Sequence, residues 1–281
     1  MNTTPSFTDT LRQRWQAADS MLCVGLDPDP ARIPAHLGTG PEAIDRFCRD
    51  IIAATADTVC AFKPQIAYFA AQGAEDVLAG LIAHIHAKHP GIPVILDAKR
   101  GDIGNTSDMY ARSFFEHLKV DALTIAPYMG SDSVQPFLKY TGHWVVLLAL
   151  TSNEGAFDFQ LTEDKEGKAL FEQVLEKSKE WGDSEQLMYV VGATKAAMLE
   201  RVRAIVPDSF LLVPGVGSQN GSLEEVARYG LNEQCGLLVN ASRSIIYADH
   251  TEAFASAAAA EAEKLRHQMA EILIKNKLVE A

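Results

Sequence analysis

Three charged residues in one short stretch have the types and spacing that acid–base chemistry requires. Asp97 and Lys99 follow the apolar run 94–96, and Asp102 comes directly after Gly101. On an extended backbone, residues two apart leave the same face, so Asp97 and Lys99 are expected side by side. Burying such charges is costly unless they are paired, and packing alone does not account for them. A solvated charged loop is the simpler alternative, but Asp97 directly continues the apolar run.

The elements that must position these residues follow a regular alternation. The sequence predicts strands over residues 21–27, 59–63, 94–100, 122–126, 144–150, 187–191, 210–213 and 236–240. Apolar residues at helical spacing separate them, as in Ile44, Phe47, Cys48 and Ile51. A short helix over 7–18 is expected before the first strand, and a long helix over about 251–275 after the last.

Strands this continuously apolar are typical of a parallel sheet that is covered on both faces. Eight strand–helix units in 281 residues predict an α/β fold, one closed (β/α)8 TIM barrel, as a single domain over residues 1–281. A doubly wound open sheet is the competing architecture.

In such barrels, functional groups lie at the carboxyl ends of the strands. The charged or polar residues predicted at those ends are Asp27, Lys63, Asp97, Lys99 and Ser152. Because neighbouring strand ends are close, we expect an alternating cluster of Lys63, Asp97, Lys99 and Asp102 in which every charge has an opposite partner. Such pairing keeps the lysines protonated, and a protonated lysine beside a carboxylate is a proton donor rather than a Schiff-base nucleophile.

A second group of residues follows the seventh and eighth strands. The turn Pro214–Gly217 allows close backbone approach, Gln219 adds an amide, and Arg243 has a guanidinium suited to bidentate phosphate binding. A glycine loop needed only for a tight turn is the simpler interpretation. In the predicted barrel, however, this is the usual phosphate position, so we expect a phosphorylated ligand.

Composition excludes several classes of protein. A net charge of −12 argues against a nucleic-acid-binding surface, and no run approaches the roughly 18 apolar residues of a membrane span. The polar N-terminal stretch 1–19 lacks the apolar core of a signal peptide. The four cysteines, which form no CxxC pair, are expected as buried thiols: Cys23, Cys48, Cys60 and Cys235. A cytoplasmic protein is therefore predicted.

Metal and serine-hydrolase chemistry lack a sequence signal. No His/Cys/Asp cluster has metal-ligand spacing, and no Ser-His-Asp arrangement is recognisable. His84, His86 and His89 lie on or after a predicted helix away from the strand ends, and are expected on the surface. We therefore expect no metal site.

The stretch Asp97–Thr106, DAKRGDIGNT, resembles the D-x-K-x-x-D-I-x-N-T signature of the orotidine 5′-phosphate decarboxylase family. The sequence looks most like the longer bacterial branch of that family. The resemblance covers essentially the whole chain, because Lys63, Ser152, the loop 214–219 and Arg243 fall on the expected strands.

This resemblance implies cofactor-free decarboxylation of orotidine monophosphate to uridine monophosphate, the last step of de novo pyrimidine synthesis. It implies that Lys99 stabilises and protonates a carbanion at C6 of the pyrimidine, with Asp97 near the departing carboxylate. It also implies an obligate homodimer with composite sites, in which Asp102 and Thr106 reach into the partner's site.

The same resemblance assigns the binding residues. Asp27 and Lys63 would hold ribose hydroxyls, and Ser152 would contact the amide edge of the pyrimidine. The phosphate would be bound at the loop that begins with Pro214, by Gln219, by Arg243 and by nearby backbone N–H groups. One departure is Ser242, where many relatives carry glycine before the arginine.

Two other functions are compatible with parts of this pattern. A magnesium-dependent keto-sugar-phosphate decarboxylase of the same superfamily would share D-x-K-x-x-D but lack the I-x-N-T continuation. A non-catalytic nucleotide-binding barrel would retain the pocket and have lost the reaction.

Overall fold

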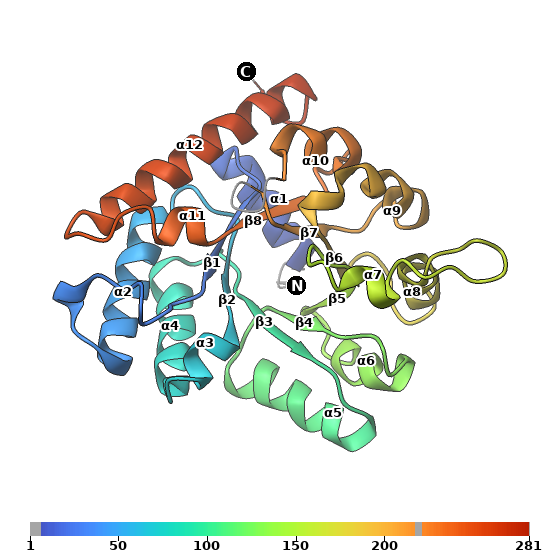
Figure 1. Ribbon diagram of the computed structural model, residues 1–281, viewed down its shortest axis with the longest axis horizontal. Helices are drawn as coiled ribbons and strands as arrows, with labels where there is room; N and C mark the ends of the chain where they lie inside the picture. The colour runs from blue at the N-terminus through green and yellow to red at the C-terminus, as the bar shows by residue number, and fades with distance from the viewer. Residues whose placement is uncertain (1–6, 217–220, 281) are drawn as a thin grey trace, which may run out of the picture.

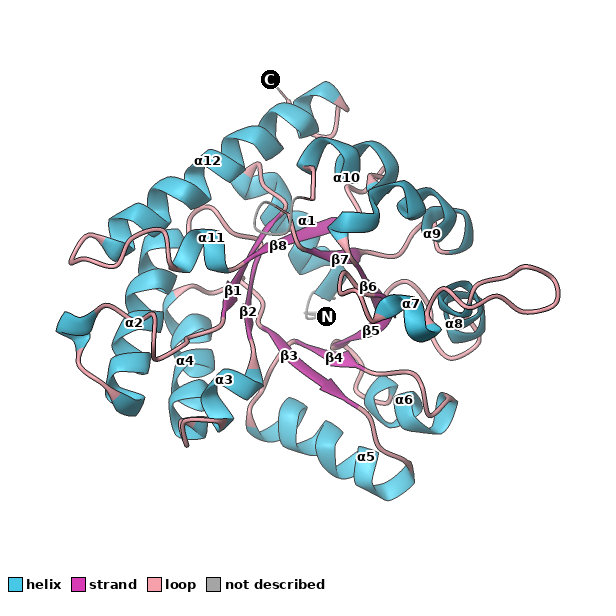
Figure 2. Ribbon diagram, viewed as in Figure 1, coloured by secondary structure: helices cyan, strands magenta, loops and turns pink. Residues whose placement is uncertain are grey.

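A ring of eight parallel strands forms the centre of the molecule, and helices surround it (Figures 1 and 2). The computed structural model describes residues 7–216 and 221–280. The strands are β1 (Leu22–Leu26), β2 (Ala61–Pro64), β3 (Ile95–Arg100), β4 (Ala122–Ile125), β5 (Trp144–Leu150), β6 (Leu187–Val191), β7 (Leu211–Pro214) and β8 (Leu237–Ala241). All eight predicted strands are thereby confirmed.

The ladder runs in the order β2-β1-β8-β7-β6-β5-β4-β3. Between β2 and β3, isolated bridges join Phe62 to Val94 and Gln65 to Asp97, so the ring is nearly closed. This closure excludes the doubly wound open sheet and confirms the predicted (β/α)8 barrel. The strands are buried on both faces because side chains fill the barrel and helices cover its outside.

The helices that cover the barrel follow the strands in turn. They are α2 (Gly40–Thr55), α3 (Ile66–Ala70), α4 (Glu75–Lys88), α5 (Gly104–Ala111), α6 (Ser131–Leu138), α7 (Ala156–Phe159), α8 (Leu170–Ser178), α9 (Leu199–Ile205), α10 (Leu223–Gly230), α11 (Arg243–Ile246) and α12 (Phe254–Lys275). Short 3-10 turns lie at Ala35–Leu37 and Ala193–Met198. Ser222 caps α10 by accepting a hydrogen bond from the Glu225 N–H, as its spacing predicts.

The predicted N-terminal helix is α1 (Phe7–Ala18), which lies behind the strands in the view of Figure 1. Its Leu11 and Trp15 are buried. After the third strand the sequence predicts a helix over about 107–117, and the structure differs from it in detail. The helix begins earlier, and its second half, Arg112–His117, is a π-helical turn that buries the consecutive Phe114 and Phe115.

The four cysteines are buried and free, as expected. The histidines expected on the surface, His84, His86 and His89, are each partly exposed. His86 also has a partner, because its Nε2 lies 2.9 Å from Asp121 Oδ2. The same carboxylate oxygen accepts a hydrogen bond from the Val94 N–H at 2.7 Å, at the amino-terminal end of the barrel. The sequence offered no partner for this histidine, because Asp121 is 35 residues away.

Candidate active site

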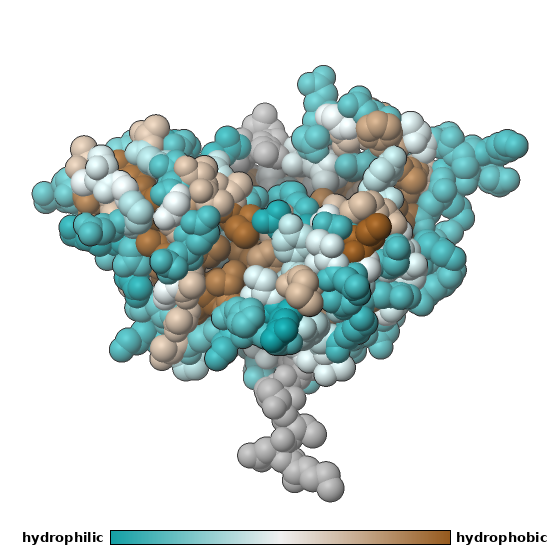
Figure 3. Space-filling view, turned by 90° about the horizontal axis from the view of Figure 1, so that it is seen from below, coloured by the Kyte–Doolittle hydropathy of each residue, from teal (hydrophilic) through white to brown (hydrophobic). Residues whose placement is uncertain are grey.

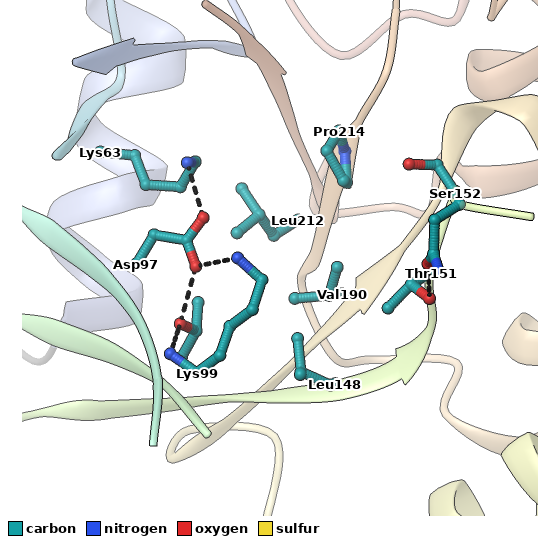
Figure 4. Close-up of a pocket in the computed structure, with 11 residues that line it drawn as sticks. Lys63, Asp97, Lys99, Leu148, Thr151, Ser152, Val190, Leu212 and Pro214 are labelled. Atoms are coloured by element: carbon teal, nitrogen blue, oxygen red, sulfur yellow. Dashed lines mark hydrogen bonds and ion pairs between the residues drawn. The ribbon is translucent and has the colours of Figure 1, made fainter. Parts of the chain in front are cut away.

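The carboxyl ends of the strands enclose a cavity of about 300 Å³. Figure 4 shows its two sides: Lys63, Asp97 and Lys99 lie on one, and Thr151 with Ser152 on the other. Apolar side chains from β5, β6 and β7 lie between them: Leu148, Val190, Leu212 and Pro214. Strand register places three of these side chains at one level, because Leu148 pairs with Val190 and Val190 with Leu212. A cavity with an apolar lining and a few convergent charges suits a small polar ligand.

Asp97 joins the two lysines of the site. Its Oδ2 accepts a hydrogen bond from Lys63 Nζ at 3.0 Å, and its Oδ1 accepts one from Lys99 Nζ at 2.6 Å. Lys63 and Asp97 are buried, whereas about half of the Lys99 side chain is exposed, at 47%. The carboxylate therefore fixes one buried ammonium and one that reaches the cavity (Figure 4).

The cluster keeps its members charged. Burial would raise the pKa of Asp97, but Lys63 and Lys99 outweigh that effect and lower it to about 2. Burial would lower the pKa of Lys63, but the carboxylates of Asp97 and Asp27 outweigh it and raise this pKa above its usual range. Opposite charges stabilise the ionised forms where desolvation opposes them. The site therefore presents a carboxylate and a buried ammonium throughout the physiological pH range.

The backbone of β3 changes direction within the cluster. The pairing of β3 with β4 shifts between Leu96 and Arg100, and Lys99 has a left-handed φ of +46°. Thr124 of β4 supports this irregular segment, because its Oγ1 accepts from the N–H groups of Ala98 and Lys99 at 2.9 and 2.8 Å. The same hydroxyl donates to Asp97 Oδ1 at 3.0 Å. A left-handed φ is uncommon for lysine, and three hydrogen bonds offset its strain here.

Sequence reasoning missed Thr124. The signal that could have found it is a hydroxyl residue within the apolar strand 122–126, on the strand beside Asp97. Asn240 of β8 was also missed. Its side chain is buried, and its Oδ1 has no hydrogen-bond partner among the described residues.

The structure distributes the other predicted residues around the barrel mouth. Asp27 follows β1, and its buried Oδ1 accepts no hydrogen bond from the described residues. Ser152 and Pro214 line the cavity. Arg243 begins α11 and is exposed. Gln219 lies outside the described residues.

Asp102 and Thr106 do not line the cavity. Asp102 Oδ1 accepts a hydrogen bond from the Ile103 N–H at 2.8 Å, and Thr106 is exposed on α5. The structure thus brings together Lys63, Asp97 and Lys99, but it joins Asp102 to neither lysine within one chain. Among residues 7–216 and 221–280, no group of three His, Cys, Asp or Glu side chains is arranged to hold a metal ion.

This geometry defines a class of protein: a (β/α)8-barrel enzyme with a charged site at the carboxyl ends of its strands. Residues 20–258 match the Orotidine 5′-phosphate decarboxylase / HUMPS family. The chain belongs to this family.

Individual relatives agree with the family match. The orotidine 5′-phosphate decarboxylase of Bacteroides fragilis is 57% identical over 256 residues, which cover 90% of this chain and 93% of that protein. The solved structure of Leishmania donovani OMP decarboxylase has a TM-score of 0.79 at 38% identity, covering 94% of this chain and 99% of that one. The solved structure of Leishmania donovani UMP synthase has a TM-score of 0.81 at 40% identity. The match covers 94% of this chain but 57% of that longer one.

Proposed function

We propose that the Lys63–Asp97–Lys99 cluster decarboxylates orotidine 5′-phosphate to uridine 5′-phosphate and CO₂. The chain is an orotidine 5′-phosphate decarboxylase, a carboxy-lyase of pyrimidine biosynthesis. The observation that carries this mechanism is the 2.6 Å contact between Lys99 Nζ and the buried Asp97 carboxylate at the edge of the cavity. It supports a protonated lysine held beside the reacting carbon.

The chemistry requires such an ammonium group. Loss of CO₂ from C6 of the pyrimidine leaves a carbanion with no adjacent electron sink. A fixed positive charge stabilises it best where water is excluded and the charge is already in place. Lys99 then delivers its proton to C6, so that one residue supplies both stabilisation and the proton. Asp97 lies near the substrate carboxylate and repels it until CO₂ departs.

The remaining predicted residues orient the nucleotide. Asp27 and Lys63 bind ribose hydroxyls, and Ser152 contacts the pyrimidine from the opposite side of the cavity. Arg243 binds the phosphate with Gln219 and with the loop that begins at Pro214. Support comes from Asp27 Oδ1, which accepts no hydrogen bond within the part of the chain that the structure describes, and from the exposed Arg243 guanidinium just after the neighbouring strand β8. Phosphate contacts far from C6 provide binding energy that orients the reacting atoms.

A homodimer would complete the site. Large apolar side chains are exposed on and beside α5: Ile103, Met109, Tyr128 and Met129. Figure 3 shows hydrophobic residues gathered on the face that carries this helix. Exposed apolar patches of this kind mark protein contacts. Asp102 and Thr106 lie next to the same side chains, so a partner seated there would receive them in its own cavity.

Mixing two inactive variants tests the composite site. A Lys99→Ala chain and an Asp102→Ala chain are expected to be inactive alone. In a mixed dimer, one of the two sites combines the intact Lys99 of one chain with the intact Asp102 of the other. Random reassociation of equal amounts should therefore restore roughly a quarter of the wild-type activity. No restored activity would mean that Asp102 acts within its own chain.

The reaction itself is tested by mixing purified protein with orotidine monophosphate and following the ultraviolet change, with and without a chelator. We expect turnover in both cases. Activity lost with the chelator would favour the magnesium-dependent decarboxylase, and UMP binding without CO₂ release would favour a non-catalytic barrel.

None of the described helices is long and apolar enough to span a membrane. Four buried free thiols support a reducing, cytoplasmic location.

A further inference from the structure

The ends of β1 and β8 are locked together at two points that flank the proposed phosphate residue Arg243. These strands are paired, and α11 follows β8 directly (Figure 1). One contact precedes Arg243 and involves Ser242. The other follows it and involves Tyr247. Both reach the segment that carries Asp27, the proposed ribose residue.

Tyr247 makes the second contact through its hydroxyl group. The hydroxyl donates to the Asp27 carbonyl at 2.7 Å and accepts from the Asp29 N–H at 2.5 Å. The ring is held as well, because it stacks on Phe47 with centroids 5.7 Å apart and the Arg32 guanidinium carbon lies 4.0 Å from its centroid. Only 7% of Tyr247 is exposed. A side chain fixed in this way has little freedom, so its hydroxyl holds the backbone of residues 27–29 in one place.

Ser242 makes the first contact by packing closely against Gly25. A Cβ placed on Gly25 would come within 1.8 Å of Ser242 Oγ and 2.9 Å of Ser242 Cβ. Ser242 therefore occupies the space that any side chain at position 25 would need. Its carbonyl accepts the N–H groups of Ile245 and Ile246, which fixes the turn that presents Arg243.

The Asp27 carboxylate depends on this arrangement. Its Oδ1 is buried and has no hydrogen-bond partner among the described residues, so its position depends on where the backbone places it. Tyr247 bonds directly to that backbone. We propose that Tyr247 is a positioning residue that fixes Asp27 relative to Arg243. Asp27 and Arg243 are then held at the distance at which they bind the ribose hydroxyls and the phosphate of the same nucleotide. This inference rests on the proposed function of the site.

Loosening Asp27 should affect the binding of the ribose and not that of the phosphate. When two ends of a ligand bind a preorganised pair of groups, loosening one group weakens the contact it makes and leaves the other. Loss of the Tyr247 hydroxyl should therefore reduce the preference for a nucleotide with ribose hydroxyls. Affinity for the phosphate alone should stay unchanged.

The test compares Tyr247→Phe with wild type, using dissociation constants for UMP, for 2′,3′-dideoxyuridine 5′-monophosphate and for inorganic phosphate. We expect UMP binding to weaken about ten-fold, as for one lost positioning hydrogen bond to a polar ligand, and binding of the other two ligands to change less than two-fold. KM for orotidine monophosphate should rise more than kcat falls.

Tyr189→Phe is the matched control, because it also removes a buried tyrosine hydroxyl. That group bonds Ser178 Oγ at 2.8 Å, away from the cavity. It should lower the melting temperature without changing the ratio of UMP to dideoxy affinity. If Tyr247→Phe behaves in the same way, Tyr247 is only a structural residue and the inference is overturned. Wild-type protein that binds no UMP would instead contradict the proposed function.

A second pair of variants examines the Ser242 contact. Gly25→Ala should weaken UMP binding in the wild-type chain, because the new methyl group displaces Ser242. In a Ser242→Gly background, the same change should alter UMP affinity less than two-fold, since the two closest obstructing atoms are gone. Equal losses in both backgrounds would show that β1 and β8 are not locked there.

Discussion

The two ends of the barrel each hold a cation, buried at one end and partly buried at the other, with different partners. At the carboxyl ends of the strands, Lys63 is paired with the Asp97 carboxylate. At the amino ends of β7 and β8, Arg203 donates to five backbone carbonyls and, among the described residues, to no side chain. Its closest contacts are Ser209 O at 2.6 Å, with Gly236 O and Gly230 O at 2.7 Å each.

The pKa values of the two cations move in opposite directions. Burial lowers the pKa of Arg203 to about 10, and the nearby Cys235 and Asp208 offset this effect only in part. The pKa of Lys63 rises, since a full negative charge outweighs its burial. Arg203 also uses all three nitrogens on carbonyls, whereas Lys63 makes one hydrogen bond with the described residues. At the amino ends of the strands, the lower end of the barrel, the cation's donors are thus all used within the fold. At the carboxyl ends, the upper end, charge and hydrogen-bond donors remain for a ligand.

The largest difference between the two ends should appear in catalysis. Lys99→Ala removes the proton donor and the charge nearest the cavity, so we expect kcat to fall by about four orders of magnitude or more. UMP affinity and melting temperature should change little, because Lys63 still pairs with Asp97. Stopped-time assays of CO₂ release and calorimetric UMP binding measure the two quantities. Substantial residual turnover would refute the role of Lys99.

Arg203→Met should produce the reverse pattern. Five backbone carbonyls lose a charged donor, and we expect the free energy of unfolding to fall by about 3 kcal/mol. The folded variant should retain its kcat within two-fold, since no contact of Arg203 reaches the cavity. Urea unfolding and a turnover assay on the same sample separate the two effects. A loss of kcat without a loss of stability would contradict the division between the ends.

Acid should weaken the ion pairs of Asp97 at the carboxyl ends of the strands, because the carboxylate becomes protonated. The pKa of Asp97 is lowered to about 2, so its ion pairs stabilise the fold above the unfolded value of about 4 and lose that contribution as the pH falls toward 2. The contribution is roughly 2 kcal/mol. Urea unfolding of wild type and Asp97→Asn at pH 5, 4 and 3 should show the difference in stability shrinking with pH. A constant difference would mean that Asp97 gains nothing from its charge.

The sequence predicted the fold well because the barrel depends on patterns that survive without tertiary information. Each apolar run became a strand, and Lys63, Asp97 and Lys99 at the ends of β2 and β3 line the cavity. What could not be predicted depends on contacts between distant segments. The bulge at Lys99 follows from hydrogen bonds to Thr124. The hydrogen bond from the Tyr247 hydroxyl to the Asp27 carbonyl joins residues 220 apart. Neither leaves a trace in local spacing.

The position of Asp102 shows another limit. Charge alternation alone suggested one cluster of four groups, but in a single chain Asp102 turns to its own backbone N–H at Ile103. The loop after Arg100 leads away from the cavity toward α5 (Figure 1). Charge order along the chain therefore does not tell which charged groups meet in the folded chain.

The smallest expected effect concerns His86 at the lower end. Hydrogen bonding to Asp121 raises the pKa of His86, so the charged pair stabilises the fold below pH 6.5 and its contribution is lost as the pH rises through the folded value. About a third of each side chain is exposed, and solvent screening limits the gain to about 1 kcal/mol or less. His86→Gln should lower the melting temperature at pH 5.5 and not at pH 9. His84→Gln on the same helix should give the opposite slope, because burial lowers the pKa of His84. Parallel curves for both variants would show that the lower end carries no titrating pair.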